Sequence, residues 1–403
     1  MTTTAFGAPP TVKFCRKCVI SNQRPRSTVE FTSDASTPKE VIGFNDDGVC
    51  EACRYHEIKE KNIDWKERDK TLRRLCDKFR KTDGGYDVII PGSGGKDSAY
   101  TSHILKYKYK MNPLTVTWAP HLYTDIGWKN FSDWIHIGGL DNLLYTPNGK
   151  LHRLLTKKAF HNLLHPFQPF IVGQRIIGPA MAKKFGVQLV MYGENQAEYG
   201  NSVDENNIPT MDPNFFSGSS DIDLIKLGGE SIETLLRNHN FTINDFTPYL
   251  PPSGESLEKA GVEVHYLGYY LKWDPQECYY YAVQNTGFEA NPERTEGTYS
   301  KYSSIDDKTD PFFYYTTYIK FGIARATYDS SQEIRNDKIT REEGVHLVRK
   351  YDQEFPGKYF DEFLEYIDTS EEEFIQTVDK FRERVPHLWK KKDGHWKLRH
   401  QVS

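Results

Sequence analysis

The sequence predicts an α/β fold: a doubly wound parallel sheet, preceded by a cysteine-rich segment and followed by a mainly helical region. Three observations lead to this fold. Short apolar runs suited to buried strands alternate with helical patterns from residue 86 onward. The first of these runs enters a glycine-rich loop that precedes a helix. Four of the six cysteines lie within the first 53 residues, as two Cys-x-x-Cys pairs.

Composition narrows the classes of protein before any motif is considered. The chain has 403 residues, enough for roughly two to three domains. Its 52 Lys and Arg against 56 Asp and Glu leave a net charge of −4, which argues against a broad electrostatic grip on nucleic acid or an anionic membrane. No apolar window approaches the roughly 18 residues of a spanning helix, and no secretory signal is recognisable. We therefore expect a cytoplasmic protein that binds neither membrane nor nucleic acid.

The N-terminal region, residues 1–62, is loop-rich and holds the two cysteine pairs. Cys15 and Cys18 form the first pair, and Cys50 and Cys53 form the second. Four thiolates can close a tetrahedral shell, each pair supplying one knuckle, as in a zinc ribbon. The metal would supply folding energy to a segment with little core of its own. We expect structural zinc here; an iron–sulfur cluster and a redox pair that handles sulfur are the alternatives.

The α/β region is expected over residues 63–200 and begins with a helix from Asp64. Its expected strands cover 86–90, 114–118, 142–146 and 188–192, and its expected helices cover 98–108, 150–164 and 174–185. Residues 201–255 are rich in Asn, Asp, Ser, Gly and Pro and are expected to form a lid or insertion outside the core. The remainder, 256–403, is expected to hold a completing strand over 262–271 and helices over 274–284, 312–334, 341–352 and 371–384.

The glycine-rich loop, residues 91–98, follows the first expected strand and has the features of a phosphate site. Gly94 and Gly95 let the backbone approach a phosphate and aim its N–H groups at an anion. The helix start adds further N–H groups and the positive end of its dipole. Lys96 adds a full positive charge, and the flanking serine hydroxyls can donate further hydrogen bonds. The alternative is a glycine turn that only connects strand to helix.

The spacing differs from a Walker A loop, because Lys96 is followed by Asp97 instead of Ser or Thr. It differs equally from a GxGxxG dinucleotide turn. Ser93-Gly-Gly-Lys-Asp-Ser98 instead resembles the signature of the PP-loop ATP pyrophosphatases, the superfamily of asparagine synthetases, GMP synthetases and tRNA sulfur-transfer enzymes. The resemblance implies that the loop cradles pyrophosphate while ATP is cleaved between its α and β phosphates, together with a bound Mg²⁺. Asp97 is expected either to bind that metal or to cap the helix.

Further segments resemble one branch of that superfamily, the N-acetyl sugar amidotransferases of bacterial surface-polysaccharide and nonulosonic-acid synthesis. Beside the cysteine pairs and the loop, these segments are 115–120, 123–128, 146–150, 166–170, 192–195, 325–329 and 339–343. Members of that family use ATP and ammonia to convert a sugar acetamido group into an acetamidino group. The resemblance implies the same reaction here, in cell-surface glycan synthesis. A UDP-linked diacetamido hexuronate and a nonulosonic acid or its precursor both fit as the N-acetylated substrate.

Site residues are expected at the carboxyl ends of the strands. By the superfamily's habit, adenine is expected near Thr117 and Trp118, at the end of the second strand. Glu194 and Asn195 follow the fourth strand and are expected to orient ammonia, accept its proton or bind Mg²⁺; a solvated loop is the alternative. Further residues considered for the substrate are Gln168, Gln174, Arg175 and Glu198.

The cysteines also bear on the source of ammonia. A glutaminase needs a nucleophilic cysteine at a mature N-terminus or in an elbow. Residue 2 is Thr, and neither Cys76 nor Cys278 sits in a Gly-x-Cys-x-Gly turn. We therefore expect an external source, and the family resemblance implies a separate glutaminase and channel pair similar to the subunits of imidazole glycerol phosphate synthase. The alternative function is a tRNA thiolase, for which Cys278 would be the catalytic cysteine.

The clustering of tyrosines has no assigned function in this interpretation. Eleven of the 25 tyrosines lie within residues 266–318. We expect them in the core and at the subunit interface of a homo-oligomer, although some could stack on sugar faces.

Overall fold

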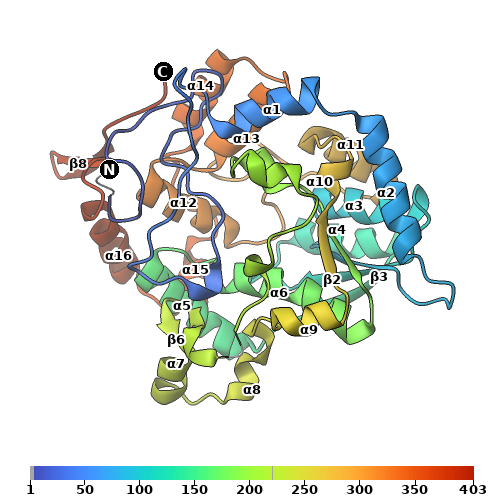
Figure 1. The fold of residues 1–403 in the computed structure, drawn as a ribbon. Coiled ribbons are helices and arrows are strands. Elements are labelled where there is room, and N and C mark those ends of the chain that lie inside the picture. The colour runs from blue at the N-terminus through green and yellow to red at the C-terminus, as the bar shows by residue number, and fades with distance from the viewer. Residues whose placement is uncertain (1–3, 220) are drawn as a thin grey trace.

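The structure is a computed structural model that describes residues 4–219 and 221–403 (Figure 1). The described residues form a central five-stranded parallel sheet in the order β3-β2-β1-β4-β7. Its strands are β1 (Val88–Pro91), β2 (Pro113–Trp118), β3 (Asp141–Tyr145), β4 (Leu189–Tyr192) and β7 (Glu263–Tyr266). The order reverses at β1, which pairs with both β2 and β4. The predicted doubly wound α/β fold is therefore confirmed, and such sheets bind ligands where the strand order reverses.

Helices cover both faces of the sheet, which explains why its strands are apolar on both sides. These helices are α2 (Trp65–Phe79), α3 (Lys96–Tyr107), α4 (Asp125–His136), α5 (Gly149–Leu163), α6 (Gln168–Phe185), α10 (Leu267–Tyr270) and α11 (Pro275–Thr286). Ile89 and Val190 pack in one cluster with α5 and α6. Ile90 and Met191, one residue further along each strand, pack in another cluster with α2 and α3. The sheet thus holds the carboxyl ends of β1 and β4 in a fixed frame.

The predicted helical C-terminal region is confirmed. Its helices are α12 (Asp310–Phe321), α13 (Arg325–Arg335), α14 (Arg341–Tyr351), α15 (Phe360–Tyr366) and α16 (Glu371–Glu383), followed by the antiparallel hairpin β8 (Trp389–Lys392) and β9 (His395–Leu398). Helices α12, α13, α15 and α16 share one hydrophobic cluster with the N-terminal cysteines. In Figure 1 the blue N-terminal loops run close to α14, where the Arg341 guanidinium donates to the carbonyls of Cys15 and Cys18, each at 3.3 Å. The second cysteine pair begins helix α1 (Glu51–Lys61), of which Cys50 is the N-cap and in which Cys53 lies.

Several predicted elements have different bounds in the structure: the helix expected over 174–185, for example, begins at Gln168. The single helix expected over 312–334 is two helices, because Gly322 takes a φ of +67° and ends α12 in the left-handed conformation typical of a C-terminal glycine. The strand expected over 262–271 ends at Tyr266, where the chain turns directly into α10. The chain is thereby turned back toward the edge of the sheet that carries the glycine-rich loop.

The segment 201–255, which was expected to form a lid or insertion, contributes side chains to the core. It contains β5 (Lys226–Leu227), β6 (Glu230–Ser231), α7 (Ile232–Asn238) and α8 (Ile243–Phe246), and α9 (Gly254–Lys259) follows. Leu227, Phe246 and Tyr249 are fully buried in the same cluster as α5 and α6. The polar composition of the segment gave no indication of these few buried side chains, because they are widely spaced in the sequence. The division of the chain at residues 62, 200 and 255 stays a prediction. Among the described helices, none combines the length and the apolar character needed to cross a membrane.

Candidate active site

The glycine-rich loop joins β1 to α3 at the point where the strand order reverses. Gly94 has a φ of +83°, and a Cβ there would lie 2.8 Å from the Cα of Phe131, so a side chain is excluded. Ser98 braces the loop: its hydroxyl accepts from the Gly94 N–H at 3.2 Å and donates to the Gly95 carbonyl at 3.0 Å. Gly95 is the N-cap of α3 and provides no capping side chain. The first N–H groups of α3 are therefore left for an anion.

Lys96 and Asp97 form a pair at the start of α3. The Lys96 Nζ lies 2.5 Å from Asp97 Oδ2. Burial lowers the pKa of Lys96, but the carboxylates of Asp97 and Glu194 outweigh burial, so the pKa lies above its ordinary value. The second oxygen, Asp97 Oδ1, is buried and has no hydrogen-bond partner among the described residues. A buried carboxylate oxygen without a donor, beside an anion-binding loop, fits a ligand of Mg²⁺.

Two cavities meet at this loop. The strand-end cavity has a volume of about 330 Å³ and lies at the carboxyl ends of β1, β2 and β4, where Pro91, Trp118 and Tyr192 line it. The acidic cavity has a volume of about 390 Å³ and lies between the loop and the helices α12 and α13. The residues that line both are Ser93, Gly95, Asp97, Gln174 and Glu194. A molecule bound at the loop can therefore reach both cavities.

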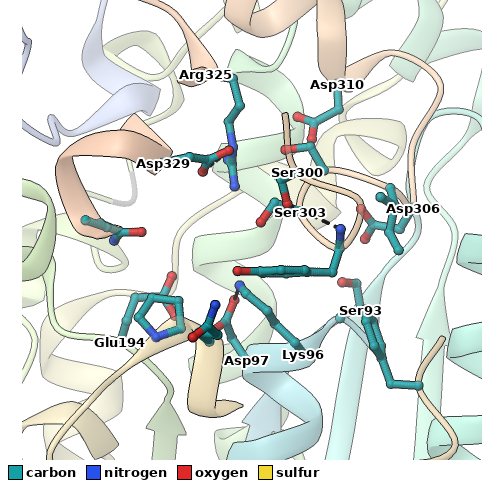
Figure 2. A pocket seen from close by; sticks show the side chains of 18 of the residues that line it. Ser93, Lys96, Asp97, Glu194, Ser300, Ser303, Asp306, Asp310, Arg325 and Asp329 are labelled. Carbon is teal, nitrogen blue, oxygen red and sulfur yellow. Dashed lines mark hydrogen bonds and ion pairs between the residues drawn. The ribbon is translucent and has the colours of Figure 1, made fainter. Parts of the chain in front are cut away.

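Carboxylates outnumber cations in the acidic cavity by seven to three. The carboxylates are Asp97, Glu194, Asp274, Asp306, Asp310, Asp329 and Glu333, and the cations are Lys96, Arg325 and Lys338. Figure 2 shows Lys96 and Asp97 below and Arg325 and Asp329 above the space between them. Burial raises the pKa of Asp310 to about 7, and burial also raises the pKa of Asp306. Proton exchange at Asp310 is therefore possible near neutral pH.

Several lining residues of the acidic cavity received no role from the sequence. Arg325 Nε lies 3.0 Å from Asp329 Oδ1, and Arg325 Nη1 donates to the Tyr314 hydroxyl. Asp306 is hydrogen-bonded to the Ser93 side chain of the loop. The four-residue spacing of Arg325 and Asp329 on α13 was the available signal, since it places both on one helix face. Nothing local indicates that the loop carrying Asp306 reaches Ser93.

The structure brings together only some of the residues that were predicted to contact the nucleotide or to act on ammonia. Trp118, Arg175 and Glu194 line the strand-end cavity. Thr117 does not, because its side chain is buried and accepts a hydrogen bond from Asn142 Nδ2 at 3.0 Å. Asn195 is buried and accepts from the Ala197 N–H at 3.0 Å, which starts the short helix η2 (Gln196–Tyr199). Gln174 lines both cavities.

Gln168 and Glu198 lie outside both cavities. The Gln168 side-chain amide is fully buried; it donates to the carbonyls of Glu30 and Lys226 and accepts from the Gly228 N–H. Glu198 is buried against Lys59, whose Nζ donates to its two carboxylate oxygens at 3.0 and 3.1 Å. The structure therefore does not bring these two side chains to either cavity, and protein groups occupy their polar atoms.

The four N-terminal cysteines converge on one point. Their sulfur atoms all lie within 4.8 Å of one another. The Sγ atoms of Cys15 and Cys53 are 3.9 Å apart, and those of Cys18 and Cys50 are 3.7 Å apart. Metal–sulfur bonds of about 2.3 Å in a tetrahedron place the sulfurs about 3.8 Å apart. The donor set therefore fits a single tetrahedral metal ion, whereas the thiolates of a four-iron cluster bind separate irons and stand farther apart.

Comparison with known proteins bears on the C-terminal region. Residues 296–403 match the family described as LPS biosynthesis protein WbpG-like, C-terminal domain. This region carries Asp306, Asp310, Arg325 and Asp329, so the family match includes one wall of the acidic cavity. The predicted resemblance to enzymes of bacterial surface-polysaccharide synthesis is confirmed for these residues. No curated protein matches the chain.

Two solved structures show limited similarity to the whole chain. The first is NMN synthetase from Francisella tularensis. The match includes 58% of this chain and 100% of the synthetase chain, with 13% sequence identity and a TM-score of 0.26. The U34-tRNA thiolase NcsA from Methanococcus maripaludis, determined with its [4Fe-4S] cluster, covers 84% of this chain and 89% of its own, with 12% identity and a TM-score of 0.30.

Proposed function

We propose that this chain, whose C-terminal region matches a lipopolysaccharide-biosynthesis family, is an ATP-dependent N-acetyl sugar amidotransferase. It would convert an acetamido group on a sugar into an acetamidino group in cell-surface glycan synthesis. One observation carries the proposal: the glycine-rich loop, which precedes the uncapped N-terminus of α3 and Lys96, lines two cavities at once. A reaction that first activates an amide with ATP and then admits ammonia needs such a shared junction.

The chemistry explains why ATP is required. An amide carbonyl is a weak electrophile, because its oxygen is a poor leaving group. In the first step the carbonyl oxygen attacks the α-phosphorus of ATP, and the bond from that phosphorus to the bridging oxygen of pyrophosphate breaks. In the second step ammonia adds to the carbon, and AMP leaves with the former amide oxygen. The products are the protonated acetamidino sugar, AMP and pyrophosphate.

The loop and Lys96 would stabilise the charge that develops on the departing pyrophosphate. Gly95, Lys96 and Asp97 at the start of α3 all line the acidic cavity, so backbone N–H groups and the Lys96 ammonium are available at one place. A Mg²⁺ held by Asp97 would offset further phosphate charge when bound. The strand-end cavity, with Trp118 in its lining, would take the adenosine part of ATP.

The acidic cavity would receive ammonia. Excess carboxylates attract ammonium, and a carboxyl group with a pKa of about 7, as at Asp310, can accept its proton at neutral pH. Glu194 lines both cavities and would orient the nucleophile. The supply would be a separate glutaminase and channel pair. Cys278 is a poor candidate for a nucleophile, because burial raises the pKa of its thiol.

A direct assay tests the proposal. Purified chain is incubated with ATP, ammonium chloride and a panel of nucleotide-linked N-acetyl sugars and N-acetylated nonulosonic acids, and in a parallel arm with bulk tRNA and a sulfide source. We expect AMP release that depends on one sugar, and a sugar product whose mass reflects replacement of oxygen by NH. Glutamine in place of ammonium should give no product. Modification of tRNA without any change in a sugar would contradict the proposal in favour of a thiolase.

A further inference from the structure

A third cavity, of about 230 Å³, adjoins the other two and differs from the acidic cavity in its charge. Six cations line it against two carboxylates, Glu30 and Asp329. The cations are Arg24, Arg26, Lys39, Arg175, Lys320 and Arg325. We call it the basic cavity. It connects to the active site through shared lining: Arg175 also lines the strand-end cavity, and Arg325 and Asp329 also line the acidic cavity.

Lys320, on α12, is the least expected of these cations. It is 7% exposed, and its Nζ donates to the Leu163 carbonyl at 3.0 Å. It makes no ion pair with a carboxylate of the described chain. Burial lowers the pKa of Lys320 to about 7; the charges of Lys39 and Arg384 act in the same direction, and the Glu30 carboxylate opposes them only in part. A buried ammonium without an ion-pair partner destabilises a fold, and methionine would fill the same volume without that cost. A packing role therefore does not explain a lysine here.

Arg175, on α6, supplies a second cation without a carboxylate partner among the described residues. Its Nη1 is buried and has no hydrogen-bond partner in the described structure. Its guanidinium lies 4.8 Å from the centre of the Phe215 ring, which holds the side chain without using its donors. Other cations of the cavity are already paired: Lys39 Nζ lies 3.0 Å from Glu30, and Arg26 Nη2 lies 2.5 Å from Glu51. Lys320 and Arg175 are therefore two cations of this cavity that have no carboxylate partner among the described residues, and both can meet an added anion.

We propose that the basic cavity binds an anionic group of the acceptor sugar, a carboxylate or a phosphate, through Lys320 and Arg175. This inference rests on the proposed function, because it treats the acceptor as the molecule whose amide is activated at the loop. Arg175 stands where the basic cavity meets the strand-end cavity, so an anion held there anchors the acceptor beside ATP. The acceptors of this enzyme are therefore anionic, and neutral N-acetyl sugars are excluded by weak binding.

Binding measurements test this without requiring turnover. The chain is first saturated with a non-hydrolysable α,β-methylene ATP analogue, which fills the loop, and is then titrated calorimetrically with glucuronate, inorganic phosphate or N-acetylglucosamine. The variants are Lys320→Met and Arg175→Gln. The control is Lys157→Met, an outward-facing lysine that pairs with Asp368 and lines none of the three cavities.

We expect at least one of the two anions to bind the wild-type chain, and the neutral sugar to bind more weakly. Both variants should weaken anion binding by about tenfold or more, and the control should match wild type. Lys320→Met should bind the ATP analogue as the wild-type chain does, because Lys320 lies outside the strand-end and acidic cavities. Its thermal midpoint should not fall, because the substitution removes a buried charge. Glucuronate binding should weaken as pH rises above 7 in the wild type and not in Lys320→Met. The stronger anion shows whether a carboxylate or a phosphate is the natural group.

Two results would overturn the proposal: anions that bind both variants as tightly as the wild-type chain, or anions that fail to bind the wild-type chain once the loop is filled. Either result leaves the amidotransferase assay unaffected. Conversely, anion binding that depends on Lys320 stands even if no sugar is amidinated, so the two proposals fail separately.

Discussion

The Lys96 side chain is a full charge in a confined space. It lies among carboxylates at the start of α3, where the low effective dielectric strengthens its interaction with any phosphate. The backbone N–H groups beside it carry only partial charges and are fixed by Gly94 and Ser98. In the proposed reaction the loop would divide its work: the backbone would set the position of the pyrophosphate, and Lys96 would supply most of the counter-charge.

Replacing Lys96 with Ala tests this division. We expect kcat/KM for ATP to fall about 100-fold or more, since removal of one donor aimed at developing charge typically has an effect of that size. AMP release at varied ATP concentration measures it. Lys106→Ala, near the opposite end of α3, is the control and should retain turnover. If Lys96→Ala keeps both ATP affinity and turnover, the loop is only a turn between β1 and α3.

At the scale of elements, one buried ion pair joins α1 to the segment that follows β4. Lys59 Nζ donates to Glu198 and also to the Trp273 carbonyl at 2.9 Å. From the other side, Arg335 Nη2 of α13 donates to the Glu198 carbonyl at 2.7 Å. Elements far apart in sequence therefore meet at Glu198, three residues beyond Asn195. This contact fixes the path of the chain as it leaves the active-site edge of the sheet.

The Glu198→Gln variant should leave the Lys59 charge buried without a counter-ion. We expect a loss of about 3–5 kcal/mol in the free energy of unfolding, measured by urea denaturation. Adding Lys59→Met should recover part of that loss, which a double-mutant cycle quantifies. Glu255→Gln removes a solvent-exposed partner of Lys259 and should change stability by less than about 1 kcal/mol. A Glu198→Gln variant as stable as this control would show that the buried pair is not required.

Prediction from sequence succeeded for elements whose signal is local. Strands β1, β2 and β4 were found because each is a short apolar run buried in the sheet, and the loop because its glycines and lysine are contiguous. The edge strand β3 is mostly exposed. The hairpin β8–β9 was missed although Asp393 and Gly394 are a turn signal, both with positive φ, because its strands are rich in lysine. Most of the acidic cavity was also missed. Asp306 reaches the loop, and Asp310 reaches the cavity, only through long-range packing, which periodicity does not encode.

At the scale of the whole molecule, the cysteine cluster belongs to the core that also contains the C-terminal helices. Its four sulfurs lie in one hydrophobic cluster with Phe312 and Phe374. Arg335 of α13 is buried close to the thiols, which together with Glu198 raise the pKa of this guanidinium despite its burial. We infer zinc as the metal, because the sulfur spacing fits one tetrahedral ion. Metal loss should then affect α13 and α14 as well as the N-terminal loops.

Metal analysis checks the identity of the ion, and thermal unfolding checks its contribution to stability. We expect one zinc per chain, and a Cys18→Ser variant that loses the metal and unfolds at a lower temperature, because metal-binding energy is folding energy here. Cys76→Ser, in a different buried cluster, should keep its zinc. Hydrogen exchange should show faster exchange in α13 and α14 of the metal-free chain. Iron with visible absorbance in the purified protein would contradict the assignment.

The Arg325–Asp329 pair forms a wall common to the basic and acidic cavities. A ligand that moves this wall from one side changes the affinity for a ligand on the other side. Thermodynamic linkage makes the effect reciprocal: if the acceptor tightens the binding of pyrophosphate or ammonium by some factor, each of those tightens the binding of the acceptor by the same factor. Cooperativity between substrates therefore requires no second subunit and no distant effector, because one helix turn of α13 can couple the two sites.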